Sequence, residues 1–192
     1  MRKKIAQQYV AAVQAHQEAA AAAVAAKKSG HGHGASEPAS ARSLAIIFGM
    51  LLWMFGNARY AMKAWQGAQD AYVEALKLKP DNPVVLCNLS NALGALGRYD
   101  EALARAERAT AAHPEHAQAW VERGSALKLL DRTAEAVASF ERAIAQAPVL
   151  VQAHTNLAAT VLSDSVDTPR VIETGLKSLE VYLQATYRAP SL

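Results

Sequence analysis

Residues 83–116 read PVVLCNLSNALGALGRYDEALARAERATAAHPEH, and the order of residue types in this stretch returns on both sides of it. Pro80, Pro114 and Pro148 each lie 34 residues from the next. The same step separates the members of four further rows: Ala68, Ala102 and Ala136; Ala75, Ala109 and Ala143; the small residues Gly56, Ser90, Gly124 and Ala158; and the larger residues Leu52, Leu86 and Trp120, with His154 next in line. A fixed period of this length predicts stacked copies of one structural unit.

The size of the residues in each row predicts their role. Small residues let two helices approach closely, larger side chains fill the gap between neighbouring units, and proline ends a helix because it lacks a backbone donor. The rows resemble the tetratricopeptide repeat, a helix-turn-helix unit of 34 residues, with full copies over 49–82, 83–116 and 117–150. The resemblance implies an all-α fold, a right-handed α-solenoid in which a first helix (A) and a second helix (B) alternate.

Three positions depart from the family pattern. Arg59 and Arg123 stand where the family prefers an apolar residue, and Ala106 replaces an aromatic residue that Tyr72 and Phe140 keep. The resemblance is therefore weaker at these positions than in the rows of alanine and proline.

The chain continues beyond the last full repeat. After Pro148, VQAHTNLAATVL starts another A helix, SDSVDTP interrupts it, and the next helix is expected near Pro169 with Thr168 or Asp167 as its cap. Terminal units of a stack need a more polar outer face. We therefore expect residues 151–192 to form an irregular fourth repeat and a capping helix.

Two segments precede the repeats. Residues 1–27 are rich in alanine with one weak apolar stripe, which predicts a helix, and residues 28–43 contain glycine, serine and proline without periodicity, which predicts a flexible linker. The chain starts with basic residues, but the residues that follow are too polar for a signal core. We expect no cleavable signal peptide. His31 and His33 in the linker fall short of a closed metal site.

Composition and charge exclude several classes of function. The net charge of +3, from 20 Lys+Arg against 17 Asp+Glu, is too small to predict nucleic-acid binding. Cys87 is the single cysteine, so the chain forms no internal disulfide. No combination of nucleophile, base and orienting residue is evident, and no phosphate loop or metal pattern is present. We therefore expect no enzymatic activity, no metal and no cofactor.

The resemblance implies a concave groove, lined mainly by A helices, that holds a peptide or a partner helix. Placing the A helices in register predicts these partner-binding residues: Trp53, Asn57, Tyr60, Asn88, Asn91, Gln118, Glu122, Ser125, Lys128 and Asn156. Asparagine offers both donor and acceptor groups, so a ladder of asparagines can bind the backbone of an extended peptide. The alternative is that asparagine is simply common at these positions of the family.

One comparison within the family argues against a particular ligand. Members that bind chaperones clamp a C-terminal carboxylate with two asparagines and three basic residues. Asn57 and Asn88 match the asparagines, but the basic positions carry Trp53, Gln118 and Glu122. The charge that would pair with a carboxylate is missing, and Glu122 would repel it.

The apolar run LAIIFGMLLWMFG, residues 44–56, leads into the first repeat. A helix of a repeat buries one side only, so Ile46, Ile47, Met50 and Met54 form a predicted docking patch that needs a cover: the N-terminal helix, a second protein or lipid. A membrane-crossing helix wants roughly 20 apolar residues, and Asn57 and Arg59 come too early for one.

Two main hypotheses of function follow. The first is a non-catalytic scaffold or adaptor that binds a peptide or helix in its groove and supports assembly of a larger complex. The alternative is a membrane-anchored assembly factor with residues 44–62 as anchor, resembling bacterial proteins of the cytochrome c maturation type. A third hypothesis is self-assembly by end-to-end stacking. The partner remains open, and so does the compartment, either cytoplasmic or associated with the inner membrane.

Overall fold

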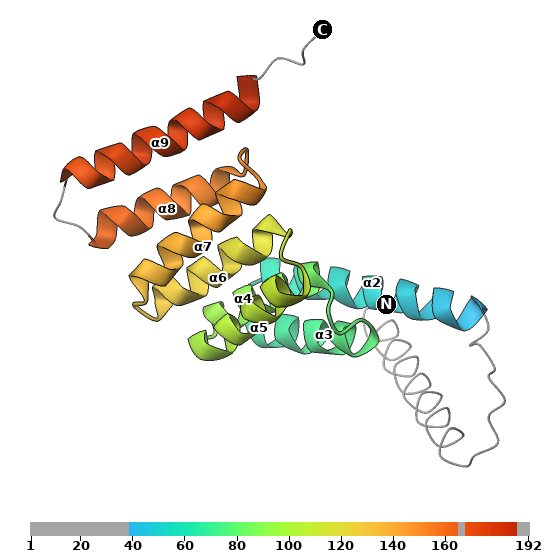
Figure 1. Cartoon of the computed structure of the whole chain (residues 1–192). Helices are drawn as coiled ribbons and strands as arrows, with labels where there is room; N and C mark the ends of the chain where they lie inside the picture. The colour runs from blue at the N-terminus through green and yellow to red at the C-terminus, as the bar shows by residue number, and fades with distance from the viewer. Residues whose placement is uncertain (1–38, 165–167, 188–192) are drawn as a thin grey trace, which may run out of the picture. The chain divides into compact units, whose positions relative to one another are not determined.

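The structure is a computed structural model that describes residues 39–164 and 168–187, and this part of the chain is helical without a strand. Its helices are labelled in Figure 1. They are α2 (Ala39–Ala61), α3 (Trp65–Leu78), α4 (Pro83–Ala95), α5 (Tyr99–Ala112), α6 (Ala117–Leu129), α7 (Thr133–Gln146), α8 (Val151–Asp164) and α9 (Thr168–Tyr187). The predicted all-α fold is confirmed. Contacts divide the chain into two units, residues 1–43 and 44–192, and the following description concerns the second.

The helices of the second unit form successive antiparallel hairpins. Helices α4 and α5 pack against each other, as do α6 and α7, and each hairpin contacts the next through α5 with α6 and α7 with α8. The A helices also touch directly, α4 with α6 and α6 with α8. The hairpins of α4 with α5 and of α6 with α7 fall within the predicted repeats 83–116 and 117–150, and the B helix α3 falls within 49–82.

The first and third hairpins each close through a matched pair of one small and one larger residue. A Cβ atom added to Gly56 would lie 2.7 Å from Cδ1 of Tyr72, and one added to Gly124 would lie 2.8 Å from Cζ of Phe140. These distances are shorter than any real carbon contact, so only glycine fits opposite the aromatic ring. The middle repeat carries Ser90 at the equivalent position, and the residue at the aromatic position is Ala106. Serine in place of glycine leaves less room for an aromatic ring, and the smaller Ala106 at the aromatic position accounts for its departure from the family pattern.

Leu86, in the row of larger residues, packs in one cluster with Ala119 of the following hairpin and Leu76 of the preceding repeat, as predicted for this row. Leu86 is fully buried. Trp120 is half-buried, and its indole Nε1 donates a hydrogen bond of 2.8 Å to the carbonyl of Pro114. His154 copies this contact in the next unit, with Nε2 lying 2.8 Å from the carbonyl of Pro148. Histidine is therefore accommodated in this row because its ring nitrogen reaches the same proline carbonyl.

The first helix starts earlier than predicted. The linker prediction of 28–43 is wrong at its end, because α2 begins at Ala39. Alanine and arginine favour a helix strongly, and Pro38 immediately before Ala39 is compatible with a helix start. The predicted helix over 1–27 and the rest of the linker lie outside the described residues. At the other end, α9 begins at Thr168, close to the predicted start.

Helix α2 divides the apolar run between a buried and an exposed side. Leu52 is buried and Gly56 packs against Tyr72. The predicted docking patch is solvent-exposed: Ile46 is 72% exposed, Ile47 49%, Met50 53% and Met54 53%. Within the described residues, no helix combines the length and the hydropathy needed to cross a bilayer.

Candidate functional site

The A helices are joined by hydrogen bonds between polar side chains, which we call rungs. In each rung a residue of one A helix pairs with a residue 31 positions later on the next A helix. The members of successive rungs are 34 positions apart, so the rungs follow the period of the repeat. The three rungs are Asn57 with Asn88 at 2.8 Å, Asn91 with Glu122, and Ser125 with Asn156 at 3.4 Å.

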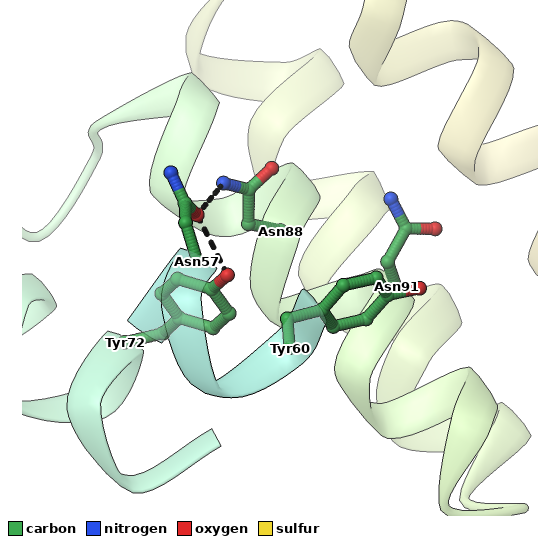
Figure 2. A pocket seen from close by; sticks show the side chains of 5 residues that line it. All are labelled: Asn57, Tyr60, Tyr72, Asn88 and Asn91. Atoms are coloured by element: carbon green, nitrogen blue, oxygen red, sulfur yellow. Dashed lines mark hydrogen bonds between the residues drawn. The ribbon is translucent and has the colours of Figure 1, made fainter. Parts of the chain in front are cut away.

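A pocket of about 280 Å³ lies beside the first rung, between α2, α3 and α4. Asn57 Oδ1 accepts hydrogen bonds from the Tyr72 hydroxyl at 2.7 Å and from Asn88 Nδ2 at 2.8 Å. Figure 2 shows that the Asn57 nitrogen and the Asn88 oxygen point away from this bond. Those two groups therefore remain available to a bound molecule. The residues lining the pocket are Asn57, Tyr60, Tyr72, Asn88 and Asn91.

Tyr72 is a lining residue that was not predicted for the site, since it comes from a B helix. Burial raises the pKa of its hydroxyl to about 12, and Tyr60 adds to this rise. Tyr72 therefore stays neutral and acts as a hydrogen-bond donor to Asn57. The signal that identifies it is the glycine at position 56, because a missing side chain on the A helix leaves room for a large ring on the B helix.

Glu122 lies in the middle rung and is only 2% exposed. Gln118 Nε2 donates a hydrogen bond of 2.6 Å to its Oε1, and Asn91 donates a second one. Burial raises the pKa of the Glu122 carboxyl, and the two hydrogen bonds oppose that rise. The prediction had placed Glu122 on an open groove wall, whereas the structure places it behind neighbouring polar side chains.

The remaining predicted residues do not join this pocket. Trp53 lines a separate cavity of about 420 Å³ with Leu78 and Val85, and its indole N–H is buried without a hydrogen-bond partner in the described part of the chain. Gln118 links α6 to α8 by a 3.1 Å bond to Gln152 Oε1. Lys128 is exposed near the end of α6. The structure thus brings Asn57, Tyr60, Asn88 and Asn91 into one pocket and places Trp53 elsewhere.

The chemistry of this face is hydrogen bonding between amide and hydroxyl groups, with the carboxyl group of Glu122 among them. Cys87 is buried, and burial first and the Glu122 carboxylate second raise the pKa of its thiol to about 12. A thiol in this state is a poor nucleophile. Among the described residues, no group of three or more metal-ligand side chains comes together. The arrangement offers donors and acceptors to a ligand.

Comparisons with known proteins match this architecture. Residues 87–150 match a family model described as tetratricopeptide repeat, and residues 56–97 match one described as TPR repeat. A heat-shock protein cognate co-chaperone of Aspergillus fumigatus, sgt12, is 39% identical over 69 residues, which are 36% of this chain and 20% of that protein. The chain therefore spans about a fifth of the length of this relative.

Solved structures share the fold. The TPR domain of Arabidopsis OM64 is 27% identical, with a TM-score of 0.58 over 62% of this chain and 98% of that one. The first TPR of Spaghetti (RPAP3), bound to the HSP90 peptide SRMEEVD, is 24% identical, with a TM-score of 0.57 over 60% and 92%. MamA of Desulfovibrio magneticus RS-1 is 22% identical, with a TM-score of 0.60 over 69% and 75%. The period, the matched pairs and these similarities agree, and residues 56–150 of the chain are tetratricopeptide repeats.

Proposed function

We propose that this chain is a non-catalytic adaptor that binds an extended peptide or a partner helix along the face formed by α2, α4, α6 and α8. The observation that carries this proposal is the pocket beside the first rung, where Asn57 and Asn88 bind each other and one group of each amide points away from this bond (Figure 2). An amide that offers both a donor and an acceptor suits a peptide backbone, whatever the side chains of the peptide are.

The similar proteins support a role in binding a protein partner. The first TPR of Spaghetti (RPAP3) was solved with an HSP90 peptide. The second TPR domain of human RPAP3 was solved with an HSP70 peptide. The relative from Aspergillus fumigatus is a co-chaperone. These similarities support protein recognition as the function, and the ligand of this chain follows from its own residues.

The residues of this chain favour a ligand other than an acidic C-terminal tail. Asn57 and Asn88 are present, but Gln118 and Glu122 stand where the carboxylate-clamping members of the family carry basic residues. The side chain of Gln118 is a neutral amide that donates a hydrogen bond to Glu122, so position 118 offers no positive charge to a carboxylate. A carboxylate approaching this face would meet the field of Glu122 instead of a cation.

A second surface favours docking of the adaptor onto a larger assembly. Ile46, Met50 and Met54 expose apolar side chains on one side of α2. A contiguous apolar patch of this kind commonly marks an interaction site. The hypothesis of a membrane anchor over 44–62 has less support, because Leu52 and Gly56 in the same stretch pack inside the first repeat.

Affinity capture with substitutions on the two surfaces tests the proposal. The tagged chain is used to capture proteins from its source cells, which are identified by mass spectrometry, and recovery is then compared between variants. Asn88→Ala removes an amide from the pocket, while Asn57 keeps its bond from Tyr72, so the fold is expected to persist. We expect a several-fold loss of the partner with Asn88→Ala.

The matched control is Gln146→Ala, which removes an amide from the exposed end of α7. This variant should recover the partner as well as wild type does. Equal recovery with Asn88→Ala and Gln146→Ala would contradict binding at the pocket. Met50→Gln tests the patch on α2 separately, and loss of a different set of proteins is expected.

A further inference from the structure

The middle rung differs from its neighbours in charge. The second position of each rung is Asn88, Glu122 or Asn156, so a carboxylate replaces an amide in the middle one. Its hydrogen-bond donors, Gln118 and Asn91, are both neutral. None of the ion pairs among the described residues includes Glu122. The face between α2 and α8 therefore carries a buried acidic group that forms no ion pair with any residue of 39–164 or 168–187.

A buried carboxylate without a cation is unfavourable, and burial accordingly raises the pKa of Glu122. Glutamine has the same shape and could accept the Gln118 hydrogen bond without that penalty. The packing of α4 against α6 thus gives no reason for a charge at this position. A positively charged ligand supplies such a reason, because it interacts with the carboxylate and not with an amide in its place.

The pocket beside the first rung places such a ligand close to the carboxylate. Asn91 lines the pocket and also donates a hydrogen bond to Glu122, so a single side chain separates the two. The other lining residues are uncharged. Asn88 Oδ1 points away from the bond to Asn57 and is an acceptor, the corresponding group of Asn57 is its amide nitrogen, and the rings of Tyr60 and Tyr72 complete the lining (Figure 2). Oxygen acceptors and aromatic rings both suit an ammonium or guanidinium group.

The field of Glu122 reaches the wall of this pocket. Burial first and the Glu122 carboxylate second raise the pKa of Tyr60, which lines it. An anionic field resists the formation of a second negative charge and favours a positive one. The contribution of Glu122 at the pocket therefore favours a cationic group and disfavours an acidic peptide.

We propose, on the basis of the peptide-binding function proposed above, that the pocket formed by Asn57, Tyr60, Tyr72, Asn88 and Asn91 accepts a lysine or arginine side chain of the bound peptide, with Glu122 as the counter-charge. The amides of the first rung hold the peptide backbone beside this side chain. The adaptor thereby selects basic segments of its partners. Glu122 acts through Asn91 and its electric field, so it is a specificity-determining residue.

A positional-scanning peptide library with both termini blocked tests this specificity. Binding of the full chain to each pool is measured by fluorescence anisotropy, and the best peptide is then resynthesised with its basic residue replaced by glutamine. We expect enrichment of lysine or arginine at one position and a several-fold loss of affinity on replacement by glutamine, because Glu122 attracts the cation across Asn91 and not by direct contact.

The variant Glu122→Gln separates specificity from folding. Glutamine still accepts the hydrogen bond from Gln118, so its thermal unfolding midpoint should be no lower than that of wild type. It should bind the lysine and glutamine forms of the peptide equally. Glu141→Gln, which removes one negative charge from an exposed position of α7, is the control and should keep the wild-type preference.

The outcomes distinguish the two proposals. If wild type binds no pool of the library, peptide binding itself is wrong and the inference falls with it. If wild type binds peptides without preferring a basic residue, or if Glu122→Gln keeps that preference, peptide binding stands and the cation pocket is wrong. Enrichment of acidic residues would also overturn the cation pocket.

Discussion

Single residues decide how closely the two helices of each hairpin approach. Gly56 and Gly124 leave space that Tyr72 and Phe140 fill, and Ser90 in the middle repeat stands at the position equivalent to these glycines, with Ala106 at the aromatic position. The Ser90 hydroxyl, in turn, donates a hydrogen bond of 2.9 Å to the carbonyl of Ala102. The pair of residues at these two positions, where the two helices of a hairpin approach each other, thus differs from repeat to repeat.

Gly124→Ala should destabilise the protein by about 1–3 kcal/mol, the usual effect of overpacking a filled site. The added methyl group would overlap with the ring of Phe140, which is fully buried and has little freedom to move. Urea unfolding followed by circular dichroism measures the change. An unchanged unfolding free energy would show that α6 and α7 are not held together by this contact.

Gly175→Ala on α9 is the control for this substitution. A Cβ atom at Gly175 would meet nothing within 4 Å, so the alanine adds helix propensity without a clash. A gain of up to about 1 kcal/mol is expected.

Glu122 sets a pH dependence of stability with a defined sign. Burial raises its pKa in the folded state above the ordinary value of 4.5, so the folded chain binds a proton more readily than the unfolded chain does. The contribution of Glu122 to stability is therefore most favourable below 4.5 and is lost as the pH rises through the folded pKa.

Glu122→Gln should remove this contribution. The variant should gain unfolding free energy relative to wild type at pH 7, and the gain should shrink when both proteins are compared in acid below 4.5. Urea unfolding at the two pH values measures it. A difference that is independent of pH would mean that the carboxyl group titrates alike in the folded and unfolded chains.

At the scale of the helical elements, the turns between A and B helices repeat the same strained geometry. Lys63, Gly97 and Asp131 all have positive φ, at 58°, 76° and 56°, and they lie 34 residues apart. Their backbone N–H groups donate to the carbonyls of Tyr60, Gly94 and Lys128, respectively. Glycine occupies only the middle turn, although the left-handed region favours it in all three.

Exchanging residues at these turns should change stability in opposite directions. Gly97→Ala should lower the unfolding free energy by about 1 kcal/mol, because a Cβ atom disfavours positive φ. Lys63→Gly should raise it by up to about 1 kcal/mol for the same reason. Thermal unfolding midpoints test both variants. Shifts of the same sign would contradict a common turn geometry.

At the scale of the whole molecule, the rungs join the A helices α2, α4, α6 and α8 to one another. In the first rung, the Asn57 nitrogen and the Asn88 oxygen point away from the bond between the two residues beside a pocket. The middle rung contributes the negative charge of Glu122. This combination sets the chain apart from the carboxylate-clamping members of its family, although the fold is shared.

The peptide SRMEEVD, which the RPAP3 domain binds, should show no saturable binding to this chain. Its acidic residues and free carboxylate would meet Glu122 without a compensating cation at position 118 or 53. Isothermal titration calorimetry with the free peptide, and with a version carrying lysine in place of both glutamates, measures the difference. Tight binding of the acidic peptide would contradict the proposed polarity of the face.

The repeat type and the all-α class were predictable from the order of residues, because they depend on spacing and local helix rules. The close approach at positions 56 and 124 was predictable for the same reason. We also expected Asn57, Tyr60, Asn88 and Asn91 on one face, since residues at the same position of successive repeats lie at the same position on successive A helices.

The arrangement of side chains within that face depends on how the helices pack in three dimensions. Tyr72 reaches the pocket from a B helix, Trp53 turns into a separate cavity, and Glu122 is buried behind Asn91. Rotations of a few degrees and shifts of about an ångström between helices settle such contacts, and no pattern along the chain encodes them. The repeat architecture thus follows from local chemistry. The set of residues that line the pocket and the burial of the Glu122 carboxyl group are decided only when neighbouring hairpins pack together.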